Sequence, residues 1–447
     1  MGKLFGTDGV RGVANSELTP ELAFRLGRAA TYLFGREYRR PVFIIGRDTR
    51  ISGQMLEAAL SAGICSAGGD AINVGVIPTP AVAYLARKLS AQAGVVISAS
   101  HNPFPDNGIK FFAGTGYKLP DAREEELEKL VLAEGDQLPR PIEDHVGTIR
   151  QRHDLIDAYI DYAIATVNTD FHGLKIVLDC ANGAAYEASP AIFRRLGAEV
   201  IVLNDQPSGL NINNCCGSTH LEGLQQAVRD HQADIGIGHD GDADRCLAVD
   251  EQGQIVDGDQ IMVICALDLM KEGRLPDNTL VATVMSNIGL HQAIKRAGGK
   301  IVVTPVGDRA VLETMLTHGY GLGGEQSGHI IFSEHSTTGD GVVTALQFVA
   351  ALKKSGKKLS ELAALMTRFP QVLFNVRIKS KAGWDENANI AAAILAAEAE
   401  LGEEGRVLVR PSGTEPLIRV MAEGPSLPQL ERLVEQIAVT IRQELEG

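Results

Sequence analysis

The chain has 447 residues, of which 45% are hydrophobic, and its formal net charge at pH 7 is -14. This length predicts several domains with ample core, and the acidic balance argues against a nucleic acid partner, although a local basic pocket could still hold a phosphate. No apolar run is long enough to span a bilayer, and residues 1–11 lack the basic-then-apolar order of a signal peptide. The six cysteines form no CxxC pair and no metal-ligand spacing with histidine, which predicts reduced thiols in a cytoplasmic protein.

Helix start and stop signals organise the first part of the chain. Thr19 followed by Pro20 predicts that a helix opens there. A second helix is predicted over 53–67, before two glycines. Asp121 and Glu124, three residues apart, resemble a capping box at the start of an acidic helix.

A strand, a helix-like stretch, a second strand and a polar loop recur three times along the chain. The first strands of the three units are 42–48, 175–179 and 279–285, and the second strands are 71–76, 198–203 and 300–304. The polar loops are the serine loop Ser98–Pro103, the acidic loop Asp240–Arg245 and the glycine-rich loop Gly324–His329. Because this repeat is longer than any solenoid period, we predict three similar α/β domains with mixed sheets, whose loops build one composite site.

Four domains are predicted: 1–152 with the serine loop, 153–252 with the acidic loop, 253–369 with the glycine-rich loop, and 370–447. The first boundary follows a polar, Pro-containing stretch without periodicity. After the last boundary the pattern changes to a strand, a helix and two more strands, and it ends on a helix with apolar residues at helical spacing. The C-terminal domain is therefore expected to be a smaller α+β domain.

The acidic loop places Asp240, Asp242 and Asp244 at alternate positions between two apolar segments. Carboxylates at this spacing converge from one side of an extended loop, where they repel one another unless a cation lies among them. Oxygen ligands in this number favour Mg²⁺ or Ca²⁺. An EF-hand is disfavoured, because Arg245 stands where its loop needs glycine and the flanks read as strands. A solvated acidic turn without metal is the plain structural alternative.

The serine loop follows an apolar strand, and Lys110 lies on the segment that returns. A serine hydroxyl is a poor nucleophile unless a base or a cation prepares it, and His101 and Lys110 are close enough in sequence to Ser100 to serve. The absence of a GxSxG elbow weakens an esterase interpretation. Taken alone, the loop is better explained as a turn at Asn102-Pro103. The functional interpretation rests on the acidic loop, which occupies the equivalent place in the next repeat.

Two further loops offer ligand-binding groups. Glu325 and Ser327, between glycines that let the backbone approach a ligand, present an acceptor and a hydroxyl to a polyol; a Gly-rich hairpin is the alternative. The arginine loop, Arg410-Pro411-Ser412-Gly413-Thr414-Glu415-Pro416, joins two strands, with Arg419 on the second. Its turn can form an anion nest and its arginines can bind a phosphate, although a solvated turn is the alternative. It lacks the layout of a nucleotide P-loop.

Together these segments resemble the α-D-phosphohexomutase superfamily, over the whole chain and in the same order. The most specific are Phe5-Gly6-Thr7-Asp8-Gly9-Val10-Arg11-Gly12, the serine loop and Gly307-Asp308-Arg309. The resemblance implies that the three α/β domains and the smaller α+β domain surround a central cleft. It also implies a phosphoserine at Ser100 and one Mg²⁺ per chain, bound by that phosphoserine with Asp240, Asp242 and Asp244.

The resemblance further assigns residues to the cleft. Around the reacting centre it implies Arg11, His101, Lys110 and Arg245. The sugar would be bound by Glu325, Ser327 and His329, and its distal phosphate by Arg410, Ser412, Gly413, Thr414 and Arg419. One departure is Ala243, where the superfamily usually has glycine; a methyl group should be tolerated there if the residue has a negative φ.

The resemblance implies an isomerase of amino-sugar metabolism that interconverts glucosamine 6-phosphate and glucosamine 1-phosphate. A sugar 1,6-bisphosphate would be its intermediate and activator. Lys110, or else His101, is expected to take the proton of the attacking hydroxyl, and Lys110 would need a pKa lowered by Arg11 or Arg245. Alternatives are a glucose or mannose phosphate mutase, a Mg²⁺-dependent sugar phosphatase, and an inert sugar-phosphate sensor. The expected partner is a small sugar phosphate, with no nucleic acid or membrane, and a homodimer is left open.

Overall fold

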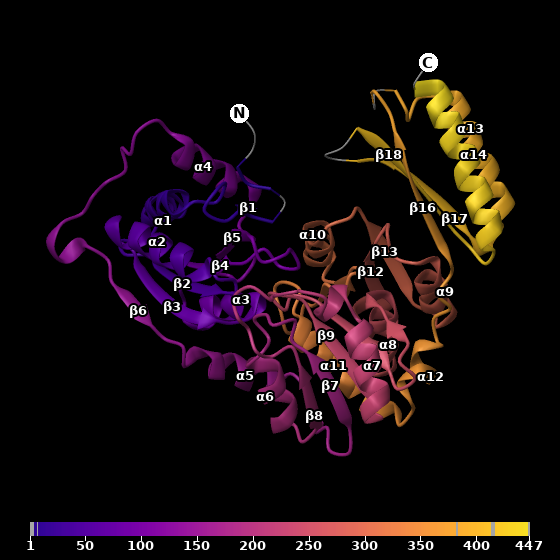
Figure 1. The fold of residues 1–447 in the computed structure, drawn as a ribbon, viewed down its shortest axis with the longest axis horizontal. Helices are drawn as coiled ribbons and strands as arrows, with labels where there is room; N and C mark the ends of the chain where they lie inside the picture. Colours follow the sequence, from indigo (N-terminus) through magenta and orange to yellow (C-terminus); the bar gives the residue numbers. More distant parts are fainter. Residues whose placement is uncertain (1–3, 7, 381–382, 413–415, 446–447) are drawn as a thin grey trace. The chain divides into compact units, whose positions relative to one another are not determined.

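The computed structural model describes residues 4–6, 8–380, 383–412 and 416–445. These residues form four β-sheets, each from one consecutive stretch of chain (Figure 1). The chain divides into two compact units, Met1–Met285 with Gly299–Ala364, and Ser286–Gly298 with Leu365–Gly447. The first three sheets lie in the first unit and the fourth lies in the second. Among the described helices, none combines the length and the apolar character that a bilayer crossing needs.

The first sheet contains β1 (Val10–Val13), β2 (Val42–Arg47), β3 (Asp70–Val76), β4 (Ala93–Ile97), β5 (Asp106–Ala113) and β6 (Ile149–Gln151). Its helices are α1 (Pro20–Gly35), α2 (Gly53–Ser66), α3 (Thr79–Lys88) and α4 (Asp121–Leu132). The second sheet contains β7 (Lys175–Asp179), β8 (Glu199–Leu203), β9 (Ile235–His239), β10 (Cys246–Asp250) and β11 (Ile255–Val256). Its helices are α5 (Leu155–Ala165), α6 (Ala188–Arg195) and α7 (Glu222–His231).

The third sheet contains β12 (Thr279–Thr283), β13 (Lys300–Thr304), β14 (Leu322–Gly324) and β15 (Ile330–Phe332). The helices around it in the first unit are α8 (Gly258–Lys271), α10 (Asp308–His318), α11 (Gly341–Ser355) and α12 (Leu359–Ala363). The second unit contains α9 (Ile288–Arg296), β16 (Gln371–Arg377), α13 (Ala388–Leu401), β17 (Arg406–Pro411), β18 (Leu417–Glu423) and α14 (Leu427–Leu445).

The first three sheets share one core topology. Their strand orders contain β5-β4-β2-β3, β10-β9-β7-β8 and β15-β14-β12-β13, which are the same arrangement in each case. Three of these strands are parallel and the fourth, β5, β10 or β15, is antiparallel to its neighbour. This confirms the prediction of three similar α/β domains with mixed sheets. The predicted boundaries at 152, 252 and 369 stay predictions.

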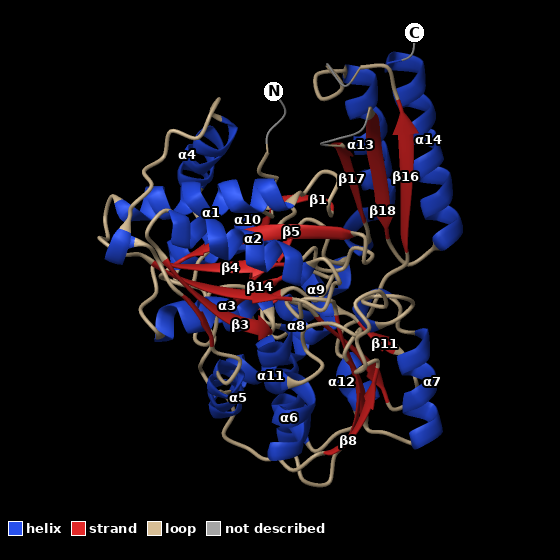
Figure 2. Ribbon diagram, turned by 60° about the vertical axis from the view of Figure 1, so that its left-hand side comes forward, coloured by secondary structure: helices blue, strands red, loops and turns tan. Residues whose placement is uncertain are grey.

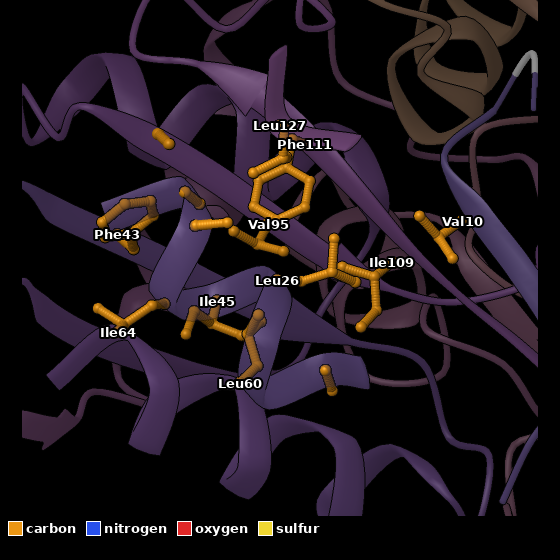
Figure 3. Close-up of a cluster of buried hydrophobic side chains, with 14 of the residues drawn as sticks. Val10, Leu26, Phe43, Ile45, Leu60, Ile64, Val95, Ile109, Phe111 and Leu127 are labelled. Atoms are coloured by element: carbon orange, nitrogen blue, oxygen red, sulfur yellow. The ribbon is translucent and has the colours of Figure 1, made fainter. Parts of the chain in front are cut away.

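Helices cover both faces of the first sheet. Figure 3 shows Leu26 of α1 and Leu60 of α2 in one buried cluster with Phe43, Ile45 and Val95 from the strands. The opposite face is covered by α3, which contacts both β2 and β4. Because parallel strands of this kind are buried on both sides, they read in the sequence as continuous apolar runs rather than alternating ones.

The two helix-start predictions had different outcomes. Thr19 is the N-cap of α1, and its side chain accepts a hydrogen bond from the Leu22 N–H at 3.2 Å, which confirms the first. The capping box at Asp121 is wrong, because α4 already begins at Asp121 and its N-cap residue makes no side-chain bond. Asp121 and Glu124 instead form ion pairs with Arg309 of α10. The local pattern that predicts a cap is overridden by ion pairs with an arginine that is distant in sequence.

The C-terminal domain has a three-stranded antiparallel sheet in the order β16-β18-β17, with α13 and α14 packed against it (Figure 2). The predicted apolar stripe of the last helix faces the core of this domain: Leu430, Leu433, Val434, Ile437 and Ile441 are buried, and the last predicted member, Leu445, is partly buried against them. The smaller α+β domain is therefore confirmed. The six cysteines of the chain, all of them in its described part, are free thiols.

Candidate active site

The three loops singled out in the sequence occupy equivalent places in the three repeated sheets. The serine loop joins β4 to β5, the acidic loop joins β9 to β10, and the glycine-rich loop joins β14 to β15. The first two loops meet directly, because the Ser100 hydroxyl donates a hydrogen bond to the Asp240 carboxylate at 2.7 Å. The fold therefore brings together residues that lie 140 positions apart in the chain.

Ser98 and Ser100 have different surroundings. The Ser98 hydroxyl donates to Asp48 at 2.5 Å and accepts the Ser100 backbone N–H at 2.9 Å, so it is engaged in holding the loop. Ser100 adopts a left-handed conformation with φ of 51° and directs its hydroxyl to the acidic loop. Of the two serines, Ser100 is the one that faces reactive groups.

The acidic triad fits a metal ion. Asp240, Asp242 and Asp244 are buried, and each offers an oxygen that lies within 4.8 Å of the others. Burial and the two neighbouring carboxylates raise the pKa of Asp240 to about 8. Asp242 and Asp244 each retain a buried carboxylate oxygen that has no hydrogen-bond partner in the described part of the chain. Crowded anions with uncommitted oxygens match the donor set that Mg²⁺ and Ca²⁺ require.

The conformation of Ala243 differs from the sequence-based expectation. A negative φ was the condition under which a methyl group would be tolerated, whereas the structure has a φ of 58°. The residue is also fully buried. A left-handed alanine costs about 1–2 kcal/mol, so the acidic loop carries backbone strain at this position.

We expect Ala243→Gly to change the free energy of unfolding by less than about 1 kcal/mol. The relieved strain is offset by about 0.8 kcal/mol for the lost methyl group and about 0.4–1 kcal/mol for the freer unfolded chain. Ala248→Gly, in the adjacent strand β10, is the control: it has the same losses without strain relief and should cost about 1–2 kcal/mol. Urea denaturation of both variants decides the point, and equal losses would contradict strain at Ala243.

Lys110 differs from the expectation of a lowered pKa. Its ammonium lies 2.8 Å from a carboxylate oxygen of Asp8 and 3.2 Å from one of Asp242. Burial disfavours the charged form, but Asp242 and Asp8 outweigh it and raise the pKa of Lys110 well above its usual range. Arg11 opposes them less strongly, and it is itself paired with Asp8. Lys110 is therefore held as a cation beside the acidic loop.

His101 lies next to the Ser100 hydroxyl. Its Nδ1 is 3.3 Å from the Ser100 oxygen, within reach of a hydrogen bond. Burial, followed by the positive charges of Arg245 and Arg11, lowers the pKa of His101 and favours the neutral imidazole. Arg245, the last residue of the acidic loop, donates its backbone N–H to Asp240 at 3.2 Å within that loop.

The glycine-rich loop is fixed by α10 and by the acidic loop. Glu325 accepts a hydrogen bond at 3.1 Å from the N–H of Gly307, the residue that caps α10. His329 lies 3.5 Å from Asp244 and 3.7 Å from Asp308. Burial disfavours its cation, but these two carboxylates raise the pKa of His329 to about 9. Ser327 lies half-buried in the same loop.

A chain of charges that the sequence did not reveal connects the first and third domains. Lys118 forms ion pairs with Asp8 at 2.9 Å and with Asp308 at 2.5 Å. Asp8 also pairs with Lys110, which contacts Asp242 of the acidic loop, and Asp308 lies beside His329 of the glycine-rich loop. The series of charged contacts therefore runs from the acidic loop to the glycine-rich loop. Asp8 and Asp308 both lie in the sequence motifs on which the family resemblance rests, so those motifs could have pointed to these two residues.

Two residues of the arginine loop's strands lie opposite each other in the C-terminal sheet. Arg410 of β17 pairs in register with Arg419 of β18. Burial, and then the charge of Arg419, lower the pKa of Arg410. Two adjacent cations on a sheet surface favour an anionic ligand. Ser412 is buried and donates its backbone N–H to Leu417 at 2.9 Å. Gly413 and Thr414 lie outside the described residues.

Comparison with known proteins accounts for this layout. Four models of the phosphoglucomutase/phosphomannomutase family match in order: alpha/beta/alpha domain I over residues 2–137, domain II over 157–253, domain III over 257–369, and the C-terminal domain over 373–439. The chain belongs to this family. It is 60% identical to the phosphoglucosamine mutase of Symbiobacterium thermophilum, with all of both chains covered. It is 58% identical to that of Heliobacterium modesticaldum, covering 99% of this chain and 100% of the relative.

Solved structures support the same fold. A phosphoglucomutase/phosphomannomutase family protein from Burkholderia thailandensis has a TM-score of 0.83 at 23% identity, covering 99% of this chain and 97% of its own. The N-acetylphosphoglucosamine mutase of Aspergillus fumigatus has a TM-score of 0.69 at 19% identity, covering 98% and 95%. Because relatives that are 58% and 60% identical to it are phosphoglucosamine mutases, the chain is an enzyme of the isomerase class.

Proposed function

We propose that this enzyme interconverts glucosamine 6-phosphate and glucosamine 1-phosphate through a phosphoserine at Ser100 and a 1,6-bisphosphate intermediate. The observation that carries the proposal is the 2.7 Å hydrogen bond between the Ser100 hydroxyl and Asp240. It places a potential nucleophile beside three carboxylates that could hold a metal ion. Relatives between 53% and 60% identical over nearly the whole chain are phosphoglucosamine mutases, which favours the amino sugar as substrate.

We infer that the metal is Mg²⁺, held by Asp240, Asp242, Asp244 and an oxygen of the phosphorylated Ser100. Bound there, it would neutralise charge on the transferring phosphoryl group. The Aspergillus fumigatus enzyme was solved with GlcNAc-6P and magnesium, and a variant of it with glucose 1,6-bisphosphate. The magnesium agrees with the proposed metal, and the glucose 1,6-bisphosphate agrees with the proposed type of intermediate. The bisphosphate would also reactivate the enzyme.

The residues around Ser100 suggest how the protein moves protons. In the first half-reaction the bond between the Ser100 oxygen and phosphorus breaks, and a bond from the sugar O1 to phosphorus forms. The O1 proton passes to His101, whose nitrogen lies beside the serine oxygen, because Lys110 is held as a cation by two carboxylates. Lys110, Arg11 and Arg245 stabilise the transferring charge. His101 passes the O1 proton on to the leaving Ser100 oxygen. In the second half-reaction the bond between the sugar O6 and phosphorus breaks, the Ser100 oxygen binds that phosphorus, and the serine proton returns through His101 to O6.

Substrate recognition is divided between two loops in this proposal. Glu325, Ser327 and His329 bind the sugar, and Arg410, Ser412, Gly413, Thr414 and Arg419 bind the distal phosphate. The domain boundaries at 152, 252 and 369 are retained as part of the proposal. So are a cytoplasmic location and a homodimer, for an enzyme that makes a precursor of UDP-N-acetylglucosamine and peptidoglycan.

The test of the function is to incubate the enzyme and Mg²⁺ with glucosamine, glucose or mannose 6-phosphate and identify the products. The amino sugar should have the highest kcat/KM, by about 5–150-fold, since losing a hydrogen bond at C2 costs roughly 1–3 kcal/mol. Equal values would indicate a general phosphohexomutase. Free phosphate as the product would instead indicate a phosphatase, and binding without turnover a sensor.

Arg419→Ala should slow both directions of isomerisation and release bisphosphate into solution. Because the same clamp must hold the 6-phosphate first and the 1-phosphate later, losing one charge-assisted contact costs about 1.5–3 kcal/mol in each half-reaction. Arg419→Lys should recover only part, since an ammonium lacks the planar fork. Rapid-quench measurement of free bisphosphate checks this, with Arg432→Ala, at an exposed position of α14, as the control. Unchanged KM without leakage would place the clamp elsewhere.

A further inference from the structure

Arg50 is a buried arginine that contacts the serine loop, and the proposed mechanism assigns it no role. It follows β2 in the sequence Asp48-Thr49-Arg50, and its side chain is fully buried. Its Nε donates to Asp48 at 2.8 Å, and its backbone N–H donates to the same carboxylate at 3.0 Å. Buried arginine normally needs such a partner, but this pairing uses only one of its three guanidinium nitrogens.

The other two nitrogens donate to the backbone of the serine loop and its continuation. One nitrogen bonds the carbonyl oxygens of Ser100 and Asn102, each at 2.8 Å. The other bonds the carbonyl oxygen of Asp106 at 3.0 Å and that of Pro103. Four carbonyl groups within seven residues therefore converge on one side chain.

A second donor reaches the same carbonyls from the second domain. The Asn213 side-chain amide donates to the carbonyl oxygens of Ser100 at 2.9 Å and Asn102 at 3.1 Å. The backbone N–H of Ser100 is fixed separately, through the Ser98 hydroxyl that donates to Asp48. Both the N–H and the carbonyl group of Ser100 are thus tied to the Asp48–Arg50 pair.

This arrangement explains how Ser100 keeps its φ of 51°. A left-handed non-glycine residue persists only where its surroundings over-determine it, and here each flanking peptide group is held. We propose that Arg50 is a positioning residue for phosphoryl transfer, which orients the Ser100 oxygen by fixing the carbonyl groups of the serine loop. The inference rests on the proposed function of Ser100.

Arg50→Lys tests this role, since lysine keeps the charge but cannot reach four carbonyls. The first domain offers a matched control in Arg28, which is equally buried. Arg28 binds Asp136 and the carbonyl oxygens of Ser66, Leu138 and Pro139, and none of its bonds reaches the serine loop. Arg28→Lys therefore removes similar contacts at a place without chemistry.

We expect both variants to lose a similar amount in Tm. Only Arg50→Lys should also lose kcat, by about 10–100-fold, with KM within about threefold of wild type. The reason is that misplacing a reacting atom by about 1 Å costs up to about 10²-fold in rate. Arg28→Lys should stay within twofold of wild type. Intact mass should also show faster loss of the Ser100 phosphate in Arg50→Lys alone. Equal kcat in the two variants would overturn the inference, whereas a wild-type enzyme without isomerase activity would overturn the proposed function instead.

If Arg50→Lys does not fold, Asn213→Ala tests the same restraint from the second domain. The exposed neighbour Asn214→Ala is its control. Asn213→Ala should lower kcat about threefold to tenfold with KM nearly unchanged, since one of two donors to the Ser100 carbonyl is kept. Identical kcat for these two variants would overturn the role assigned to the held carbonyls.

Discussion

Ser100→Ala is expected to abolish isomerisation, with a loss in kcat on the order of 10⁴-fold or more, because no other group would carry the phosphoryl between the two half-reactions. The fold should be intact, since among the described residues the hydroxyl that is lost bonds only Asp240 and His101. Quenched-flow assays for the sugar phosphates measure the loss. Intact mass should show no phosphate on the variant after incubation with substrate.

Ser98→Ala provides the matching control from the same loop. It removes the bonds that connect Asp48 to the Ser100 backbone, so it should cost about 1–3 kcal/mol of stability. The phosphate should nevertheless still appear on Ser100 in a phosphopeptide map. A map that places it on Ser98 in the wild-type enzyme would refute the assignment.

Removing the metal, or replacing Asp240 with asparagine, should lower kcat by at least about 10²-fold, since a few kcal/mol of charge stabilisation disappears. The two changes differ in their effect on stability. Without metal, Asp240→Asn should raise Tm, because burial and two adjacent carboxylates already disfavour its charge. The increase in Tm that Mg²⁺ gives the wild type should disappear in the variant.

Asp250→Asn is the control for the metal experiment. Asp250 is a buried aspartate at the end of β10, where it accepts backbone hydrogen bonds from Gln252 and Gln254. This variant should keep the increase in Tm that Mg²⁺ gives the wild type, since Asp250 is not part of the acidic loop. Full wild-type activity after exhaustive chelation would refute the metal assignment.

The sequence predicted the scaffold well because strand and loop patterns are local. Each reactive loop lies between two apolar segments, and this pattern placed Ser100, Asp240 and Glu325 at equivalent positions. The resemblance then supplied the roles. The sign of the pKa shift at Lys110 was missed because it depends on Asp8 and Asp242, which are distant in sequence. The role inferred for Arg50 was also missed, although the charged residues Asp48 and Arg50 in the turn after an apolar strand could have indicated it.

Errors in local detail have the same physical origin. Asp121 has the spacing of a capping box, but it pairs with Arg309 of another domain. Ala243 has a left-handed backbone that its own side chain disfavours, so the conformation is set by the surrounding loop and not by residue preference. In both cases tertiary contacts outweigh a local preference of about 1–2 kcal/mol.

Each reactive loop connects two neighbouring antiparallel strands and not two parallel ones. The ends of such a loop are held side by side by the strands, so changing its length costs only slowly growing closure entropy. A parallel connection would have to cross the sheet and carry a helix with it. Insertions and substitutions at residues 324–329 can thus occur without a change in the order of the strands in the sheet. The ligand preference of the glycine-rich loop can therefore change while the serine loop, which lies on a different sheet, keeps its structure.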